Sequence, residues 1–199
     1  MDLIVTATAQ GLLWGMMALG IFITYRILDL PDMTAEGSFP LGGAVCAQLI
    51  ISGVNPLVAT ASAFVIGALA GAITGFLITK AHIPGLLAGI LTMTGLYSIN
   101  LRIMGRANLS LLGEEKVTDL FKRFTLPSQF DTIFMGIIIV VSVITLLVLF
   151  FKTELGQAVI ATGDNEKMAR SLGISTNQTK ILGLMLSNGL GKMECIVSE

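Results

Sequence analysis

Apolar stretches along the chain predict a series of membrane-spanning helices, because roughly 20 apolar residues in a helix cross the hydrocarbon layer of a bilayer. Three segments are long enough and contain no Asp, Glu, Lys or Arg: Leu3–Tyr25, Leu57–Thr79 and Ile133–Phe151. A fourth segment, Leu86–Met104, holds Asn100 and Arg102 near its end, where a long cationic side chain can reach the interface. We expect each of these four segments to span the membrane.

The apolar segment Phe39–Ile51 is short for a full crossing, and Pro31, Gly37 and Pro40 lie before it or near its start. This pattern predicts a short or broken second helix. Irregular backbone at membrane depth persists only where it is buried in protein or lines a wet cavity, so the stretch LPDMTAEGSFPLGG is a candidate for a solute path. An ordinary polar loop with helix-start residues is an equally good interpretation.

Glycines recur every four residues on the predicted helices and leave bare backbone on one helix face. The pattern occurs at Gly67, Gly71 and Gly75, at Gly11 and Gly15, and at Gly85 and Gly89. We expect these faces to pack helices against one another within the chain, and we infer no oligomer from them.

The composition is that of a membrane protein, with 54% hydrophobic residues, 13% charged residues and a mean hydropathy of +0.85. The net charge is only −1 and the charges cluster between apolar segments, so a lipid bilayer is the expected surrounding and nucleic acid is not an expected partner. Cys46 and Cys195 lie in very different contexts, and we expect no disulfide framework.

A polar block after the span that ends at Phe151 predicts a short helix. Gly163 and Asp164 indicate its start, and Asp164 or Asn165 can cap it. Gly173 indicates its end.

The predicted helix carries a small apolar patch, formed by Met168, Ala169 and Leu172, beside charged side chains. Such a helix could dock in a groove of another protein or rest on lipid headgroups, and the residues favour neither. The Lys and Arg residues are divided almost equally between the two sides of the predicted membrane, so they do not orient the chain.

The segment GQAVIATGDNEKMARSLGIS resembles the coupling loop of permease subunits of bacterial ABC importers, in the branched-chain amino acid permease superfamily. Two further stretches, DLPDMTAEGSFPLGGAV and IPGLLAGILTMTGLYSINLRIMGRANLSLL, resemble an uncharacterised branch of it with amino-acid-like substrates. The similarity covers roughly Gly11 to Gly189. It implies an all-α, polytopic helix bundle in the bacterial inner membrane, with a short cytoplasmic coupling helix that enters a cleft of an ABC ATPase subunit.

By position, the resemblance assigns the ATPase contact to Gly163, Asp164, Asn165, Met168, Ala169 and Arg170. The chain has no GxxxxGK[ST] motif to cradle ATP phosphates, so we expect no cofactor and no catalytic residue here, and ATP bound by the partner ATPase. Movement of the ATPase would then produce alternating access.

Small polar residues of the broken segment and the fourth span are candidates for lining the solute path. They are Thr34, Glu36, Ser38, Thr92, Thr94 and Asn100. The resemblance further implies a second permease copy, as a homodimer, and an extracytoplasmic solute-binding protein that carries most of the specificity for an amino acid or similar solute.

We expect residues 1–191 to form one transmembrane permease domain with a coupling loop at 152–178, followed by an aberrant polar tail at 192–199. The family continues with further spans, whereas the apolar stretch Ile181–Gly191 is too short to cross a membrane. We therefore expect a truncated or frameshifted end, and a chain that cannot transport alone.

Two other classes of function fit less well. An ion-coupled secondary transporter places ionisable groups within its spans, and the three longest apolar segments have none. An intramembrane enzyme would need a motif such as GxSxG or HExxH, and neither occurs; His82 lies in a short turn, KAHIPG, where a structural role is expected.

Overall fold

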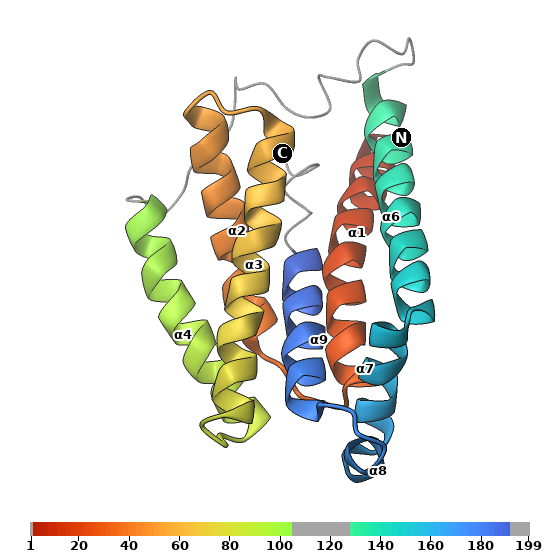
Figure 1. Ribbon diagram of the computed structural model, residues 1–199. Helices are drawn as coiled ribbons and strands as arrows, with labels where there is room; N and C mark the ends of the chain where they lie inside the picture. The colour runs from red at the N-terminus through yellow and green to blue at the C-terminus, as the bar shows by residue number, and fades with distance from the viewer. Residues whose placement is uncertain (1, 105–127, 192–199) are drawn as a thin grey trace.

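The structure of the protein is a computed structural model that describes residues 2–104 and 128–191. Within these ranges the chain forms helices that stand side by side in a bundle (Figure 1), which confirms the predicted all-α class. The helices are α1 (Asp2–Phe22), its π-helical continuation η1 (Ile23–Ile27), α2 (Thr34–Ile51), α3 (Pro56–Thr79), α4 (Gly85–Met104), α6 (Ser128–Lys152), α7 (Glu154–Asp164), α8 (Glu166–Ser171) and α9 (Thr176–Leu190).

Each predicted span coincides with a helix: α1 with η1, α3, α4 and α6. By length and composition, α3 and α4 can each cross a membrane, over Val58–Thr79 and Gly85–Ile103. Together α6 and α7 form a third candidate span, although the chain bends by 81° between them. Within the described residues, α1 and η1 contribute a shorter apolar helix, Trp14–Ile27.

The second helix is longer than the sequence indicates. α2 starts at Thr34, so the prediction of a short helix from Phe39 is wrong, and the irregular stretch is confined to residues 28–33. Pro40 lies inside α2 on its exposed side, while Ser38 and Leu41 are buried. The helix continues through the proline because burial of its opposite face offsets the single missing backbone hydrogen bond.

Helix α9 lies inside the bundle, between α1 and α3 (Figure 1). Two glycines allow α3 to approach it closely: a Cβ atom at Gly71 would collide with the backbone of Leu184, and one at Gly75 would lie 3.0 Å from Ile181. At Gly71 and Gly75 the predicted glycine face of α3 is therefore confirmed as a packing surface within the chain. The same prediction is wrong for Gly11 and Gly15, because nothing among the described residues lies within 4 Å of their Cβ positions.

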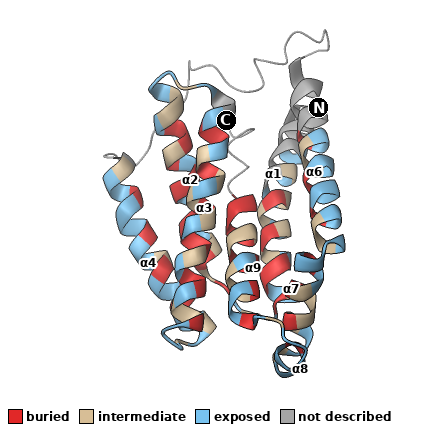
Figure 2. Cartoon of the chain, viewed as in Figure 1, coloured by how far each residue is buried: buried red, intermediate tan, exposed pale blue. Residues whose placement is uncertain are grey.

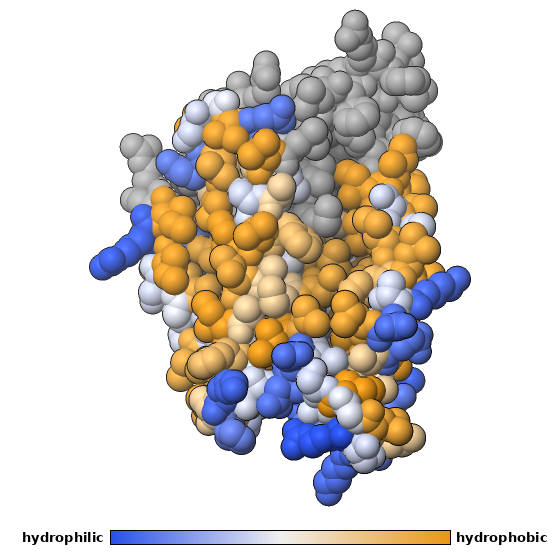
Figure 3. Space-filling view, in the orientation of Figure 1, coloured by the Kyte–Doolittle hydropathy of each residue, from blue (hydrophilic) through white to orange (hydrophobic). Residues whose placement is uncertain are grey.

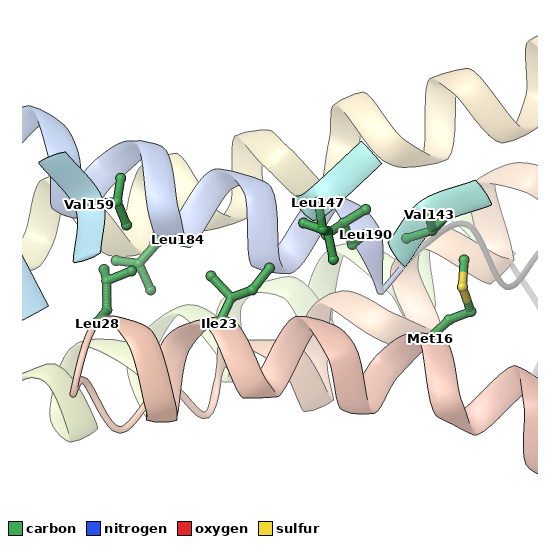
Figure 4. Close-up of a cluster of buried hydrophobic side chains, with 8 residues drawn as sticks. All are labelled: Met16, Ile23, Leu28, Val143, Leu147, Val159, Leu184 and Leu190. Carbon is green, nitrogen blue, oxygen red and sulfur yellow. The ribbon is translucent and has the colours of Figure 1, made fainter. Parts of the chain in front are cut away.

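A hydrophobic core joins α9 to the first helix and to α6 and α7. Its buried side chains, drawn in Figure 4, are Met16, Ile23, Leu28, Val143, Leu147, Val159, Leu184 and Leu190. Because Leu28, Val159 and Leu184 share this core, the end of η1, helix α7 and helix α9 are packed together.

The outward faces of the helices are apolar. Figure 2 shows exposed residues along the outer sides of α3, α4 and α6, and Leu69, Leu91 and Leu146 are each more than half exposed. Hydrophilic side chains gather at the end of the bundle where α8 lies (Figure 3). An apolar belt with a polar end is the surface expected of helices surrounded by lipid.

Cys46 is fully buried in α2. The other cysteine, Cys195, belongs to the predicted polar tail at 192–199, which lies outside the described residues.

Candidate functional site

A sharp bend separates α7 from α6. Thr153 caps α7, because its side chain accepts a hydrogen bond of 3.3 Å from the backbone N–H of Gly156. Gly156 in turn lies directly against the backbone of Phe150 and Phe151, where a Cβ atom would collide. The threonine cap and the glycine together allow the 81° turn that directs α7 away from the axis of α6.

Helix α8 is a separate, short helix at the end of the bundle (Figure 1). Asn165 interrupts the chain with an extended conformation (φ −156°, ψ 98°) and caps α8, since its side chain accepts a hydrogen bond of 3.0 Å from the Met168 N–H. Beyond the helix, Gly173 has a φ of +83°, which glycine adopts at little cost. Both the Asn165 cap and the Gly173 stop are confirmed.

The predicted start of this helix is wrong in one respect. Gly163 and Asp164 form the last turn of α7 rather than the first turn of the next helix. The reason is local, because the Thr153 cap starts a helix ten residues earlier and the chain stays helical until Asn165.

Glu166 anchors α8 to the first two turns of α9. Its Oε2 accepts a hydrogen bond of 2.8 Å from Lys180 Nζ, and its Oε1 accepts bonds of 3.4 Å from Thr176 Oγ1 and 3.2 Å from Arg170 Nη2. The hydrogen bond from Lys180 lowers the pKa of Glu166 below its ordinary value of 4.5; partial burial opposes this, and the charges of Lys180 and Arg170 add to it. The carboxylate is therefore ionised at neutral pH and holds α8 in place.

The opposite side of α8 is exposed and partly apolar. Met168 is 60% exposed and Leu172 is 68% exposed, whereas Ala169 between them is 1% exposed and faces the protein. Lys167 and Arg170 are exposed beside them. Of the predicted apolar patch, Met168 and Leu172 are thus free to contact another molecule.

The structure divides the six residues that the resemblance assigns to an ATPase contact. Those on the exposed surface are Asp164, Asn165, Met168 and Arg170. The other two face the protein's own helices, since Ala169 is buried and Gly163 packs against the backbone of Ile27 and Leu28.

A cluster of buried polar side chains lies where the irregular stretch 28–33 meets α2 and α9. Asn188 is its centre: its Nδ2 donates to Asp32 Oδ2 at 2.9 Å, and its Oδ1 accepts from Ser38 Oγ at 2.9 Å. Asp32 Oδ1 also accepts from the Thr34 backbone N–H at 2.8 Å. Asp32, Ser38 and Asn188 are each at most 4% exposed, so buried polar groups satisfy one another here.

The predicted path residues are not all in this cluster. Thr34 and Ser38 belong to it, and Thr34 Oγ1 also lies 2.8 Å from Thr74 Oγ1. Thr92 and Asn100 are buried on α4, and no partner is found for Asn100 Oδ1 among the described residues. Glu36 and Thr94 are exposed.

Three residues of the cluster were missed from the sequence: Asp32, Thr74 and Asn188. Asp32 lies within the LPDMTAEGSFPLGG stretch and could have been selected as an ionisable group at membrane depth. Nothing in the pattern of the chain connects Thr74 or Asn188 to that stretch, because their proximity depends on how α3 and α9 pack.

Two of the unfilled spaces between the described residues have different linings. A cavity of about 10 Å³ beside the polar cluster, close to the space of one water molecule, is lined by residues that include Ser38, Ser187 and Asn188. An apolar groove of about 650 Å³ runs between α3 and α6, with Leu186 and Leu190 of α9 in its lining. Within the described ranges, no three His, Cys, Asp or Glu side chains gather as metal ligands would.

Comparison with known proteins decides the family. The family model described as "Branched-chain amino acid transport system / permease component" matches residues 3–191. The chain belongs to this permease family. With its apolar helices, a member of this family is a multi-pass protein of the bacterial inner membrane.

Curated relatives of this permease-family chain are themselves longer. It is 44% identical to the tyrosine transport system permease protein of Clostridioides difficile (strain R20291), over 94% of this chain and 61% of that protein. It is 35% identical to an uncharacterized protein of Rickettsia prowazekii (strain Madrid E), over 97% and 66% respectively. The ribose import permease protein of Escherichia coli (strain K12) is 28% identical, over 91% and 56%. The chain thus spans about three fifths of the length of these relatives, and no solved structure matches it.

Proposed function

We propose that this chain is the membrane-spanning permease subunit of an ATP-driven ABC importer and that α8 is the helix on which a separate ATPase subunit docks. The observation that carries the proposal is the placement of α8: it projects from the end of the bundle, with Met168 and Leu172 exposed, in a chain that belongs to a permease family. Membership of that family favours this function over an ion-coupled secondary transporter.

The two sides of α8 suit a docking helix. The exposed side offers Met168 and Leu172 for burial, with Asp164 and Arg170 as charges at its rim. The inner side is fixed by Ala169, which is 1% exposed, and by the contacts of Glu166 with α9. A helix held in this way presents its apolar side chains without first having to be ordered, which favours binding.

ATP would be bound and hydrolysed in the docked ATPase, and this side of the membrane would be cytoplasmic. A second permease copy, as a homodimer, and an extracytoplasmic solute-binding protein complete the proposed importer. Residues 1–191 would act as one permease domain containing the coupling loop at 152–178.

We place the solute path beside the buried polar cluster. Thr34 and Ser38 are small polar groups within it, and Thr92 and Asn100 are buried polar groups on the neighbouring α4. The exposed Glu36 and Thr94 would line a path only where this chain faces a second copy. The solute class we favour is an amino acid, on the strength of the tyrosine transport relative.

Docking can be tested by co-purifying the full chain with the ABC ATPase subunit of its transport system. The variant Met168→Asp/Leu172→Asp should weaken the complex at least about tenfold, because burying one such side chain is worth about 1.5–3 kcal/mol. Leu155→Asp is the matched control, since Leu155 is a 58% exposed leucine at the start of α7. Unchanged binding by the α8 variant, or equal loss in the control, would refute docking on α8.

A further inference from the structure

Helix α9 is attached at its two ends to two different parts of the protein. At its start, Lys180 Nζ lies 2.8 Å from Glu166 Oε2 on α8, and the Lys180 side chain is only 16% exposed. Removing one member of a partly buried ion pair of this kind costs more than removing one member of an exposed pair such as that between Arg170 and Glu166. A second connection runs to α7, where Thr179 Oγ1 lies 2.9 Å from the buried Thr162 Oγ1.

The other end of α9 reaches the irregular stretch before α2. Asn188 bonds to Asp32 and to Ser38, as described above, and Ser187 Oγ donates a hydrogen bond of 2.6 Å to the backbone oxygen of Gly20 in α1. These residues lie in three segments that are distant in the sequence. Asn188 is 1% exposed, so its hydrogen bonds are shielded from water and costly to lose.

Between its ends, α9 is a continuous helix that packs directly on backbone. Gly71 and Gly75 of α3 face Leu184 and Ile181, and Gly183 of α9 faces the side chain of Leu28. Close-packed interiors of this kind shift as units rather than deform. From Lys180 to Asn188 the helix rises by about 12 Å, at 1.5 Å per residue.

We propose that α9 is a rigid link that couples the position of α8 to the polar cluster at Asp32, with Glu166, Lys180 and Asn188 as its positioning residues. The use of this link in transport rests on the proposed function, because α8 must be the docking helix for a partner to move it. The link itself is a property of the chain.

Two backbone amides report on the two ends. The Thr34 N–H donates to Asp32 Oδ1 at 2.8 Å, and the Met168 N–H donates to Asn165 Oδ1 at 3.0 Å. Because side chains hold both amides, their hydrogen exchange measures the local integrity of each end. Exchange would be followed for the full chain in lipid nanodiscs.

Lys180→Met should speed amide exchange at Met168. It should also speed exchange at Thr34, although Lys180 touches no member of the cluster. The expected change at Thr34 is about fivefold or more, which is the lower end of typical coupling between two sites. Asn188→Leu should speed exchange at Thr34 and, by reciprocity, at Met168 by a similar factor. Lys167→Met is the matched control, because Lys167 is an exposed lysine of α8, and it should leave Thr34 unchanged. If the Lys180→Met variant loses protection from amide exchange throughout α3, the Glu166→Gln variant is measured in its place, and the same changes at Met168 and Thr34 are expected.

The proposal is overturned if each variant loosens only its own end, or if the Lys167 control changes Thr34 as strongly as Lys180→Met. The result is separable from the docking test. Coupling without ATPase docking would refute the proposed function and leave the link intact, whereas docking without coupling would refute the link alone.

Discussion

Gly163 of α7 lies so close to the carbonyl oxygen of Ile27, at the end of η1, that a Cβ atom at position 163 would overlap that oxygen. Helix α7 therefore rests directly on the end of the first helix, backbone against backbone. The resemblance to a coupling loop assigns Gly163 to an ATPase contact, whereas its position is explained by packing within the chain. A glycine is needed here to seat the helix that precedes α8.

Gly163→Ala should destabilise the protein by about 1–3 kcal/mol, the usual cost of forcing an extra methyl group into a packed site. The comparison is Gly43→Ala in α2, because nothing lies within 4 Å of the Cβ position at Gly43. There alanine should be neutral or stabilising, since glycine within a helix costs about 0.5–1 kcal/mol relative to alanine. Unfolding midpoints in detergent would measure both variants, and a Gly163→Ala protein as stable as Gly43→Ala would contradict the packing.

The pair formed by Thr34 and Thr74 offers a second prediction. Thr74 Oγ1 donates to the Ala70 carbonyl oxygen at 3.2 Å, so the Thr34 hydroxyl donates to Thr74 across 2.8 Å. Thr74→Val should cost about 1–3 kcal/mol, because it leaves the buried Thr34 hydroxyl without an acceptor.

The double variant Thr34→Val/Thr74→Val should cost less than the two single variants added together, because no buried hydroxyl is then left unpaired. The control is Thr145→Val on α6, where the exposed hydroxyl bonds only to its own helix at Val141; the expected change is within about 0.5 kcal/mol. Strictly additive costs in a double-mutant cycle of unfolding free energies would show that the two hydroxyls do not interact.

The membrane helices were predictable because apolar length alone determines them. Leu57–Thr79 and Leu86–Met104 differ by one residue from α3 and α4. The start of α2 was not predictable from Pro40, because the packing of the buried face of α2 decides whether a proline interrupts it.

Features of the candidate site that depend on neighbouring residues in the sequence were predictable, whereas those that depend on how the helices pack were not. The cap at Asn165 and the stop at Gly173 follow from side chains acting on their own neighbours. The ion pair of Glu166 with Lys180, and the meeting of Asp32 with Asn188, join residues 14 and 156 positions apart. Spacing along the chain says nothing about such contacts.

Acid should weaken the contribution of Glu166 to stability. Since its pKa in the folded protein lies below its ordinary value of 4.5, the contribution is fully present above the unfolded-state pKa and is lost as the pH falls through the folded-state pKa. The unfolding midpoint of the natural chain should therefore exceed that of Glu166→Gln at pH 7, and the difference should shrink towards pH 3. Glu154→Gln, at an exposed glutamate in the first turn of α7, is the control and should show no such convergence. A difference that is constant from pH 7 to pH 3 would rule out the ion pair as its source.

Removing the cap of α8 should loosen that helix directly. Six residues are too few to be helical without support, and Asn165→Ala removes the side chain that holds the Met168 N–H, at a typical cost of about 1 kcal/mol. Amide exchange within Glu166–Ser171 should then quicken about fivefold, while the amides of α3 and α9 keep their protection.

Asn165→Asp is the matched control, because a carboxylate oxygen can accept the same hydrogen bond and also favours a helix N-terminus. It should leave the exchange of α8 unchanged or slower. If the α8 amides exchange at the same rate in Asn165→Ala and Asn165→Asp, then Ala169 and Glu166 hold α8 in place without its cap. The shape of the docking surface would then depend on the contacts with α9 rather than on the break between α7 and α8.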